Sequence, residues 1–151
     1  MLNITKEQFI ENASANSVIP LYEEFACDFI TPVVLFSKLN KEHAFILESI
    51  GDSEKFGRYS FIGFDPKYTF SYSDGETVIT DSDSGQTPLE GNPLDHLNQL
   101  IKKYKPLYYE SKSGFLGGAV GYMGYDIISL IEDIPMNNTD DVRVPDMYFI
   151  I

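Results

Sequence analysis

Several residue types that commonly build functional sites are scarce in this sequence. The 151 residues include one cysteine, Cys27, so no internal disulfide can form, and only two histidines, His43 and His96. A zinc site needs more such ligands than this chain supplies. The first residues lack the basic start and apolar run of a secretion signal, so we expect a reducing, cytoplasmic compartment. Cys27 has no cationic neighbours in sequence and is predicted to be a small core residue.

Positive charge and long apolar runs are also lacking. Eleven Lys and Arg residues stand against 23 Asp and Glu residues, which gives a net charge of −12. Nucleic acids and anionic membranes are therefore poor partners for this chain. The longest nearly uncharged stretch, residues 113–125, contains five glycines. It falls well short of the roughly 20 residues that span a bilayer, so no transmembrane segment is predicted.

The familiar catalytic and metal-binding motifs do not occur either. The glycines at 114, 117, 118, 121 and 124 form neither a dinucleotide fingerprint nor a phosphate loop, so close packing against another backbone is predicted for them. Asp81, Asp83 and Gly85 resemble the start of a calcium loop. The glycine comes one position early, however, and Asn92 stands where a bidentate Glu is required. We therefore expect no catalytic centre and no metal site within this segment.

What the sequence does contain is enough apolar material for one folded domain. Hydrophobic residues make up 43% and aromatic residues 14% of the chain, which argues against disorder. Runs of strand pattern alternate with shorter helical patterns. The fold class predicted is α+β (mixed α/β), with an antiparallel-rich sheet or a two-sheet sandwich and flanking helices. Helices are expected at 6–14, 32–39, 93–105 and 127–131, strands at 18–25, 43–49, 58–64, 67–73, 76–80, 115–122 and 146–151, and a surface loop at 81–91.

Local signals support three of these boundaries. Thr5 and Gln8 fit a capping box, and Thr31 before Pro32 fits a second helix start. The Ser73-Asp74-Gly75 sequence is a hairpin turn signal. The last six residues, 146–151, are mostly large and apolar, whereas chain termini are usually exposed and polar. We therefore expect the chain to be the beginning of a longer protein.

One strand end has the polar groups to hold an amino acid. Glu48 and Ser49 follow Leu47, so a carboxylate and a hydroxyl adjoin, and Arg58 and Tyr59 come shortly after. A carboxylate accepts from an ammonium group, and a hydroxyl both donates and accepts. The alternative is that Glu48 is solvated, Ser49 starts a turn and Arg58 pairs with a nearby carboxylate.

The same residues carry a resemblance. The chain resembles the N-terminal domain of anthranilate synthase component I, of the chorismate-utilising enzymes, through short motifs in the family order. The motifs are Pro20-Leu21-Tyr22, Asp28, Thr31-Pro32-Val33, Lys38-Leu39, Ile46-Leu47-Glu48-Ser49, Gly57-Arg58-Tyr59-Ser60-Phe61-Ile62-Gly63, Gly117-Gly118, Gly121-Tyr122, Tyr125-Asp126 and Pro145-Asp146.

The resemblance implies a regulatory role for residues 1–151, as the incomplete N-terminal domain of a larger enzyme. Leu47, Glu48 and above all Ser49 would form part of the pocket for L-tryptophan as feedback inhibitor, with possible support from Arg58 and Tyr59. The full enzyme would be a lyase that makes anthranilate from chorismate, with Mg²⁺ and with ammonia from a glutamine amidotransferase subunit, component II. The catalytic domain, with its chorismate and magnesium sites, is absent from this chain, which alone is expected to be inactive.

Two other readings remain open at this point. Aminodeoxychorismate synthase component I, of the folate pathway, shares the domain and the substrate, although the segment 28–33 and the Leu-Glu-Ser element favour the tryptophan enzyme. A free-standing amino-acid-binding or interaction module is the alternative from another class. The reading frame beyond Ile151 distinguishes them, because about 300 further residues are expected for a synthase and a stop codon for a module.

Overall fold

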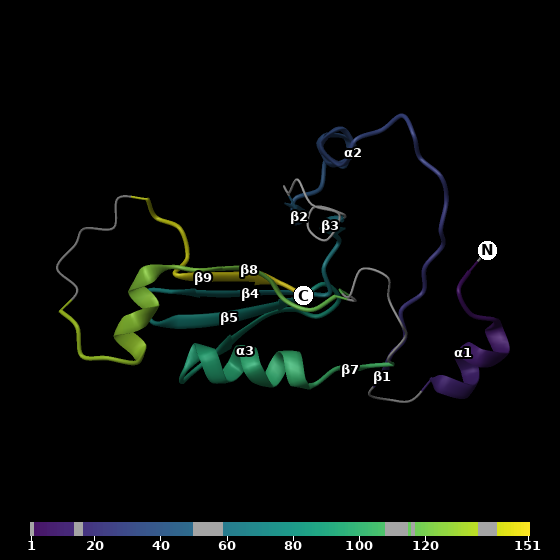
Figure 1. The fold of residues 1–151 in the computed structure, drawn as a ribbon. Coiled ribbons are helices and arrows are strands. Elements are labelled where there is room, and N and C mark those ends of the chain that lie inside the picture. The colour runs from purple at the N-terminus through teal and green to yellow at the C-terminus, as the bar shows by residue number, and fades with distance from the viewer. Residues whose placement is uncertain (1, 14–16, 50–58, 108–114, 116, 136–141) are drawn as a thin grey trace. The chain divides into compact units, whose positions relative to one another are not determined.

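A computed structural model describes residues 1–151 except 1, 14–16, 50–58, 108–114, 116 and 136–141 (Figure 1). Its helices and mainly antiparallel sheets confirm the predicted α+β class. The chain divides into two compact units that interleave in sequence. Unit 1 comprises residues 1–64 and 102–117, and unit 2 comprises residues 65–101 and 118–151.

Unit 1 begins with two short helices that start where the sequence predicts. In α1 (Lys6–Asn12), the Thr5 hydroxyl accepts from the Gln8 N–H and the Gln8 side chain accepts from the Thr5 N–H, which completes the capping box. In α2 (Pro32–Lys38), the Thr31 hydroxyl accepts from the Val34 N–H. A hydrogen-bonded cap satisfies backbone donors that the first helical turn leaves free.

The strand predicted at 18–25 is wrong beyond its first residue. Strand β1 covers only Ser17–Val18 and pairs in parallel with β7 (Lys105–Pro106). The following backbone bonds to Asn3 instead: the Asn3 side chain donates to the Pro20 carbonyl and accepts from the Tyr22 N–H. Since Pro20 has no N–H to give to a ladder, this local partner replaces a neighbouring strand. Cys27 in the same stretch is exposed, so its predicted place in a core is also wrong.

The remaining sheet of unit 1 is the antiparallel pair of β2 (Ala44–Glu48) and β3 (Ser60–Phe64). Helix α2 contacts both strands. The strands fall within the predicted runs, and their ends are shorter by one or two residues.

Unit 2 is built on a five-stranded antiparallel sheet with the order β6-β5-β4-β9-β8. Its strands are β4 (Tyr68–Ser73), β5 (Glu76–Asp81), β6 (Gly85–Leu89), β8 (Val120–Met123) and β9 (Met147–Ile150). Helix α3 (Pro93–Lys102) runs beneath the sheet, and a 3-10 helix, η1 (Tyr125–Leu130), follows β8 (Figure 1). None of the described helices has the length and apolar character that a membrane crossing requires.

Two predictions about this sheet need correction. Residues 85–89 form β6 rather than a loop, because Gly85 adopts a φ of +86° that closes a second tight turn after β5. The strand predicted at 115–122 starts only at Val120, because Gly117 and Gly118 have φ values of +122° and +135°. The Asp74-Gly75 turn, with φ values of 52° and 84°, is confirmed.

Every buried residue of the described chain belongs to unit 2. Phe70 and Met147, on neighbouring strands, are fully buried, and α3 contributes residues at helical spacing. The buried set is Tyr68, Phe70, Thr77, Pro93, Leu97, Leu100, Ile127, Met147 and Ile150. The described residues of unit 1 are all exposed or half-buried.

Gly121 shows why a glycine is needed within β8. A Cβ atom at this position would overlap the backbone carbonyl of Tyr148 on β9. The close packing predicted for the glycine-rich segment is therefore confirmed at Gly121, whereas Gly117 and Gly118 serve the chain reversal before the strand.

Candidate functional site

The predicted site residues Leu47, Glu48 and Ser49 lie at the end of β2. In the register with β3, Leu47 faces Phe61 and Glu48 faces Ser60. Successive side chains of a strand point to opposite faces, so Leu47 and Glu48 belong to opposite faces of the hairpin. Ser49 is the first residue after β2, and the same alternation carried one residue further assigns it to the face of Leu47. The carboxylate and the hydroxyl that adjoin in sequence therefore serve different faces of the hairpin.

The face of Leu47 and Ser49 is strongly aromatic. The Phe61 ring meets the Phe115 ring edge-on, with centroids 5.0 Å apart and an interplanar angle of 73°. The Tyr59 ring lies 6.4 Å from the Phe61 ring. Edge-to-face pairs of this kind are favourable beyond their apolar burial. The arrangement gathers three aromatic rings on the face of Leu47.

The same face is closed at its other end by Phe45. The Phe45 ring occupies the space above Gly63, where a Cβ atom would overlap it. Glycine at this position thus lets an aromatic ring from β2 lie directly on β3. On the opposite face, Glu48 and Ser60 continue an apolar pair, Ile46 opposite Ile62.

The site is open in this chain. Leu47 is 45% exposed, and Glu48 and Ser49 are exposed as well. Tyr59 is half-buried, and Arg58 lies outside the described residues. The register of β2 and β3 thus separates Leu47 from Glu48, and the alternation carried one residue beyond each strand assigns Ser49 and Tyr59 to the face of Leu47. The aromatic residues of this face are half-buried and Leu47 and Ser49 are exposed, so the face could contact an aromatic ligand from one side only.

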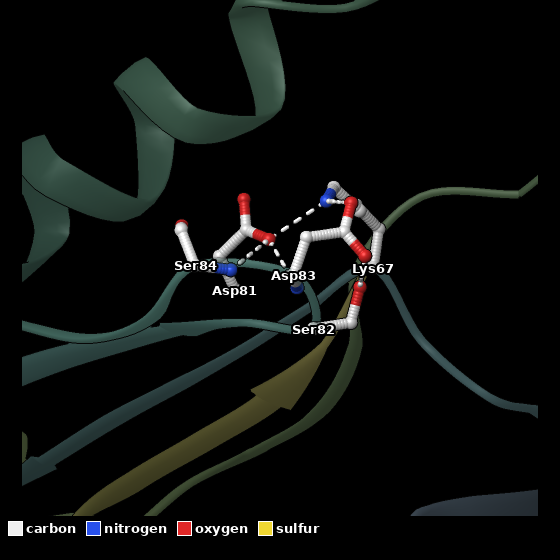
Figure 2. Close-up of polar contacts among 5 residues, drawn as sticks. All are labelled: Lys67, Asp81, Ser82, Asp83 and Ser84. Atoms are coloured by element: carbon white, nitrogen blue, oxygen red, sulfur yellow. Dashed lines mark hydrogen bonds and ion pairs between the residues drawn. The ribbon is translucent and has the colours of Figure 1, made fainter.

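A second polar cluster occupies the turn between β5 and β6 (Figure 2). The Lys67 ammonium donates to Asp81 Oδ1 at 2.7 Å and to Asp83 Oδ2 at 2.6 Å. Asp81 Oδ1 also accepts from the backbone N–H groups of Asp83 and Ser84. These bonds hold the turn in place.

The hydrogen bond from Lys67, followed by that from the Asp83 amide, lowers the pKa of Asp81 to about 2. The two carboxylates in turn raise the pKa of Lys67. Both carboxylates thus face the ammonium of Lys67, and no group of acidic, His or Cys side chains suited to a metal ion occurs among the described residues. The cluster is structural, because it satisfies turn amides at an exposed hairpin.

Sequence reasoning missed the part of the site that comes from distant residues. Phe115 follows β3 by some fifty positions and carries no motif, so only the fold brings it against Phe61. The contact of Phe45 could have been predicted from the sequence. A large aromatic residue in one strand and a glycine in the neighbouring strand suggest that the ring packs on the glycine. The separation of Glu48 from Ser49 follows from strand alternation alone.

The chain is similar to curated proteins named anthranilate synthase component 1. It is 34% identical to the protein of Geobacillus stearothermophilus over 145 residues, which cover 94% of this chain and 28% of the relative. The protein of Bacillus subtilis is 37% identical over 88% of this chain and 26% of its own length. The protein of Acetivibrio thermocellus is 34% identical over 88% of this chain and 27% of its own length. Comparison with protein-family models gives no match.

The resemblance predicted from short motifs is therefore confirmed over nearly the whole chain. The chain spans a little more than a quarter of the length of these curated relatives. It matches a segment of anthranilate synthase component 1.

Proposed function

We propose that this chain is the N-terminal regulatory segment of an anthranilate synthase component 1, and that its Leu47 and Ser49 face is half of a feedback site for L-tryptophan. The observation that carries the proposal is a match over 94% of this chain to 28% of a relative of that name. The aromatic residues beside exposed Leu47 support it, because an indole ring is a fitting partner for aromatic side chains.

Each site residue has a distinct physical role in this proposal. Phe61, held edge-on by Phe115, offers the ligand ring an aromatic contact worth about 0.5–1.5 kcal/mol beyond its burial. Ser49 donates or accepts a hydrogen bond at the polar end of the ligand. Tyr59 extends the aromatic wall. Glu48 belongs to the other face of the hairpin, away from the ligand in this arrangement, so its carboxylate is left to balance a cation on that face, such as an arginine.

The other wall of the pocket would come from the catalytic domain, outside this chain. Tryptophan would then favour the inhibited arrangement of the two parts through contacts made only in that arrangement. A coupling of about 1–3 kcal/mol is the usual scale for such regulation.

The remaining functions of the enzyme are also assigned to the polypeptide beyond this segment. The complete protein would be a cytoplasmic lyase that converts chorismate and ammonia into anthranilate and pyruvate, with the ammonia released from glutamine by component II. Magnesium would bind in the catalytic domain, as the resemblance to the family implies. We expect this chain alone to form no anthranilate.

The decisive experiment compares two serines on opposite faces of the hairpin. In the complete enzyme, Ser49→Phe fills the effector face and should raise the tryptophan inhibition constant by about tenfold or more, with uninhibited turnover largely retained. Ser60→Phe is the matched control, because Ser60 lies opposite Glu48 on the other face and should leave the constant unchanged. An unchanged constant in the Ser49 variant would overturn the assignment.

Binding can also be followed directly on the 151-residue chain. The chain contains no tryptophan, so indole fluorescence excited beyond the tyrosine band reports the ligand alone. We expect a weak blue shift of L-tryptophan emission on titration, because the ring leaves water for the aromatic face. The Ser49→Phe variant should abolish the shift and the Ser60→Phe variant should keep it.

A further inference from the structure

The effector face, by which we mean the face of the β2 and β3 hairpin that carries Leu47, is built from successive cross-strand pairs. The register places Phe45 opposite Gly63. The next pair on the same face is Leu47 with Phe61. Side chains two residues apart in a strand share a face and lie about 7 Å from each other. Phe45 is therefore the neighbour of Leu47 along this face, on the side away from Ser49.

The Phe45 ring covers its own cross-strand pair. A Cβ atom on Gly63 would overlap Cε1 and Cζ of Phe45, which lie at the far end of the ring. The ring therefore reaches across from β2 and lies on the backbone of β3, in space that a side chain at position 63 would fill. Both residues are half-buried. This part of the effector face is thus occupied by an aromatic ring of the protein itself.

The exposure of the face increases directly after this ring. Leu47 is 45% exposed, and Ser49 is exposed as well. Opposite Leu47, the Phe61 ring packs edge-on against Phe115 and is half-buried. The open stretch of the face therefore begins at Leu47 and runs to Ser49, which is a step of about 7 Å in extended backbone.

We propose that Phe45, seated on Gly63, determines which aromatic amino acids the effector face accepts, because it limits the length of the ligand's ring. The inference rests on the proposed function, in which Ser49 bonds the polar end of the ligand. With that end fixed, the side chain of the ligand runs along Leu47 toward the edge of the Phe45 ring. A single fused ring such as indole fits a stretch of this length, whereas two phenyl rings joined in line would collide with Phe45.

A residue that excludes a longer ligand by collision acts on specificity more than on affinity. Specificity is a difference between two affinities, and a clash with the wrong ligand changes that difference without a new contact to the right one. Removal of the Phe45 ring should therefore favour the longer ligand far more than it affects L-tryptophan. The prediction concerns the ratio of two inhibition constants and not the strength of inhibition.

The test measures two inhibition constants on the complete enzyme, one for L-tryptophan and one for L-4-phenylphenylalanine, whose side chain is two phenyl rings in line. In the unmodified enzyme, the constant for phenylphenylalanine should be higher by about tenfold or more. Phe45→Ala should lower the ratio of the two constants by about tenfold or more, because the second ring gains the space that Phe45 filled. Both constants come from the same variant, so changes in turnover or in the amount of folded enzyme cancel from the ratio.

Phe64→Ala is the matched control. Phe64 loses the same atoms in the same hairpin, but it pairs with Ala44 on the other face and should leave the ratio unchanged. Phe45→Leu covers the case in which Phe45→Ala fails to fold. Leucine keeps an apolar side chain but lacks the ring atoms that reach Gly63, so it should lower the ratio in the same direction.

The outcomes separate this inference from the proposed function. An enzyme that L-tryptophan does not inhibit, or whose inhibition Ser49→Phe leaves unchanged, contradicts the proposed function itself. If inhibition depends on Ser49 but neither Phe45 variant lowers the ratio, or Phe64→Ala lowers it as much, the role of Phe45 alone is overturned. Equal inhibition of the unmodified enzyme by the two amino acids would also overturn it.

Discussion

Phe70 and Phe29 are identical side chains in opposite situations. Phe70, in β4 of unit 2, is fully buried, whereas Phe29, in unit 1, is 99% exposed. The same contrast holds for the units as wholes. Unit 2 buries aromatic, aliphatic and thioether side chains between its sheet and its helices, and unit 1 leaves large apolar residues open along its length. Those of unit 1 are Leu2, Phe9, Ile10, Val18, Leu21, Tyr22, Phe25, Phe29, Ile30, Val33, Val34, Leu35, Leu47 and Phe64.

The difference shows that apolar content alone does not make a core. In unit 2, antiparallel strands from distant parts of the sequence assemble one continuous sheet, and an amphipathic helix covers it. The elements of unit 1 are two short helices and two two-stranded pairs, β1 with β7 and β2 with β3. No residue of unit 1 whose burial is described is buried. This is what the proposed function expects of unit 1, whose apolar surface would be covered by the rest of a longer polypeptide.

The strongest test of this contrast truncates one phenylalanine in each unit. Phe70→Ala leaves a cavity in a packed core and should lower the free energy of unfolding by about 3–5 kcal/mol. Phe29→Ala removes an exposed ring and should change it by less than about 0.5 kcal/mol. Equilibrium urea unfolding, followed by circular dichroism, measures both. Similar losses of unfolding free energy in the two variants would contradict the difference in burial between the two units.

A smaller effect is expected from a methyl group added to one glycine in each unit. Gly121→Ala drives a Cβ atom against the Tyr148 carbonyl, which is fixed by the sheet, and should destabilise the chain by about 2 kcal/mol. Gly63→Ala meets the Phe45 ring instead, and that half-buried side chain can rotate away. The loss of unfolding free energy in Gly63→Ala should stay below about 1 kcal/mol. Thermal unfolding of the two variants measures which one loses more stability. A larger loss in Gly63→Ala than in Gly121→Ala would contradict this prediction.

The smallest effect concerns acid stability. Because the pKa of Asp81 is lowered from 3.8 to about 2, its contribution to stability is complete above pH 3.8 and is lost as the pH falls through about 2. Lys67→Met should remove the largest part of that contribution and leave the part due to the Asp83 and Ser84 amides, so the melting temperatures of the variant and the unmodified chain should converge over this range. Lys38→Met, on α2 of unit 1, is the control and should leave the acid limb unchanged. A pH-independent difference for Lys67→Met would contradict the role given to the turn cluster.

Local signals predicted the parts of the fold that depend on local chemistry. Thr5, Thr31 and the Asp74-Gly75 turn all act within a few residues of themselves, and all were confirmed. The β2 and β3 strands could also be predicted, because each is a short run rich in apolar and β-favouring residues, bounded by turn signals.

The errors arose where a distant or unrecognised partner decides the structure. The strand pattern after Val18 was overridden by hydrogen bonds to Asn3. Strand β6 was read as a loop because its polar composition suits an edge, and the register with β5 that makes it a strand is not visible in its own residues. At the candidate site, the residues Leu47, Glu48 and Ser49 could be proposed from sequence, whereas the aromatic wall at Phe115 required the tertiary fold.

The pairing of β4 with the distant strand β9 affects how the chain folds during synthesis. Strand β4 can form its hairpin with β5 as soon as both leave the ribosome, yet its other neighbour is β9, at residues 147–150. Closing so long a loop is slow, because the chain must lose much freedom before any contact rewards it. Met147, fully buried beside Phe70, is therefore among the last residues that synthesis delivers to the core. Until it arrives, the side of β4 that pairs with β9 has no strand partner, and an unpaired strand edge of this kind favours misassembly.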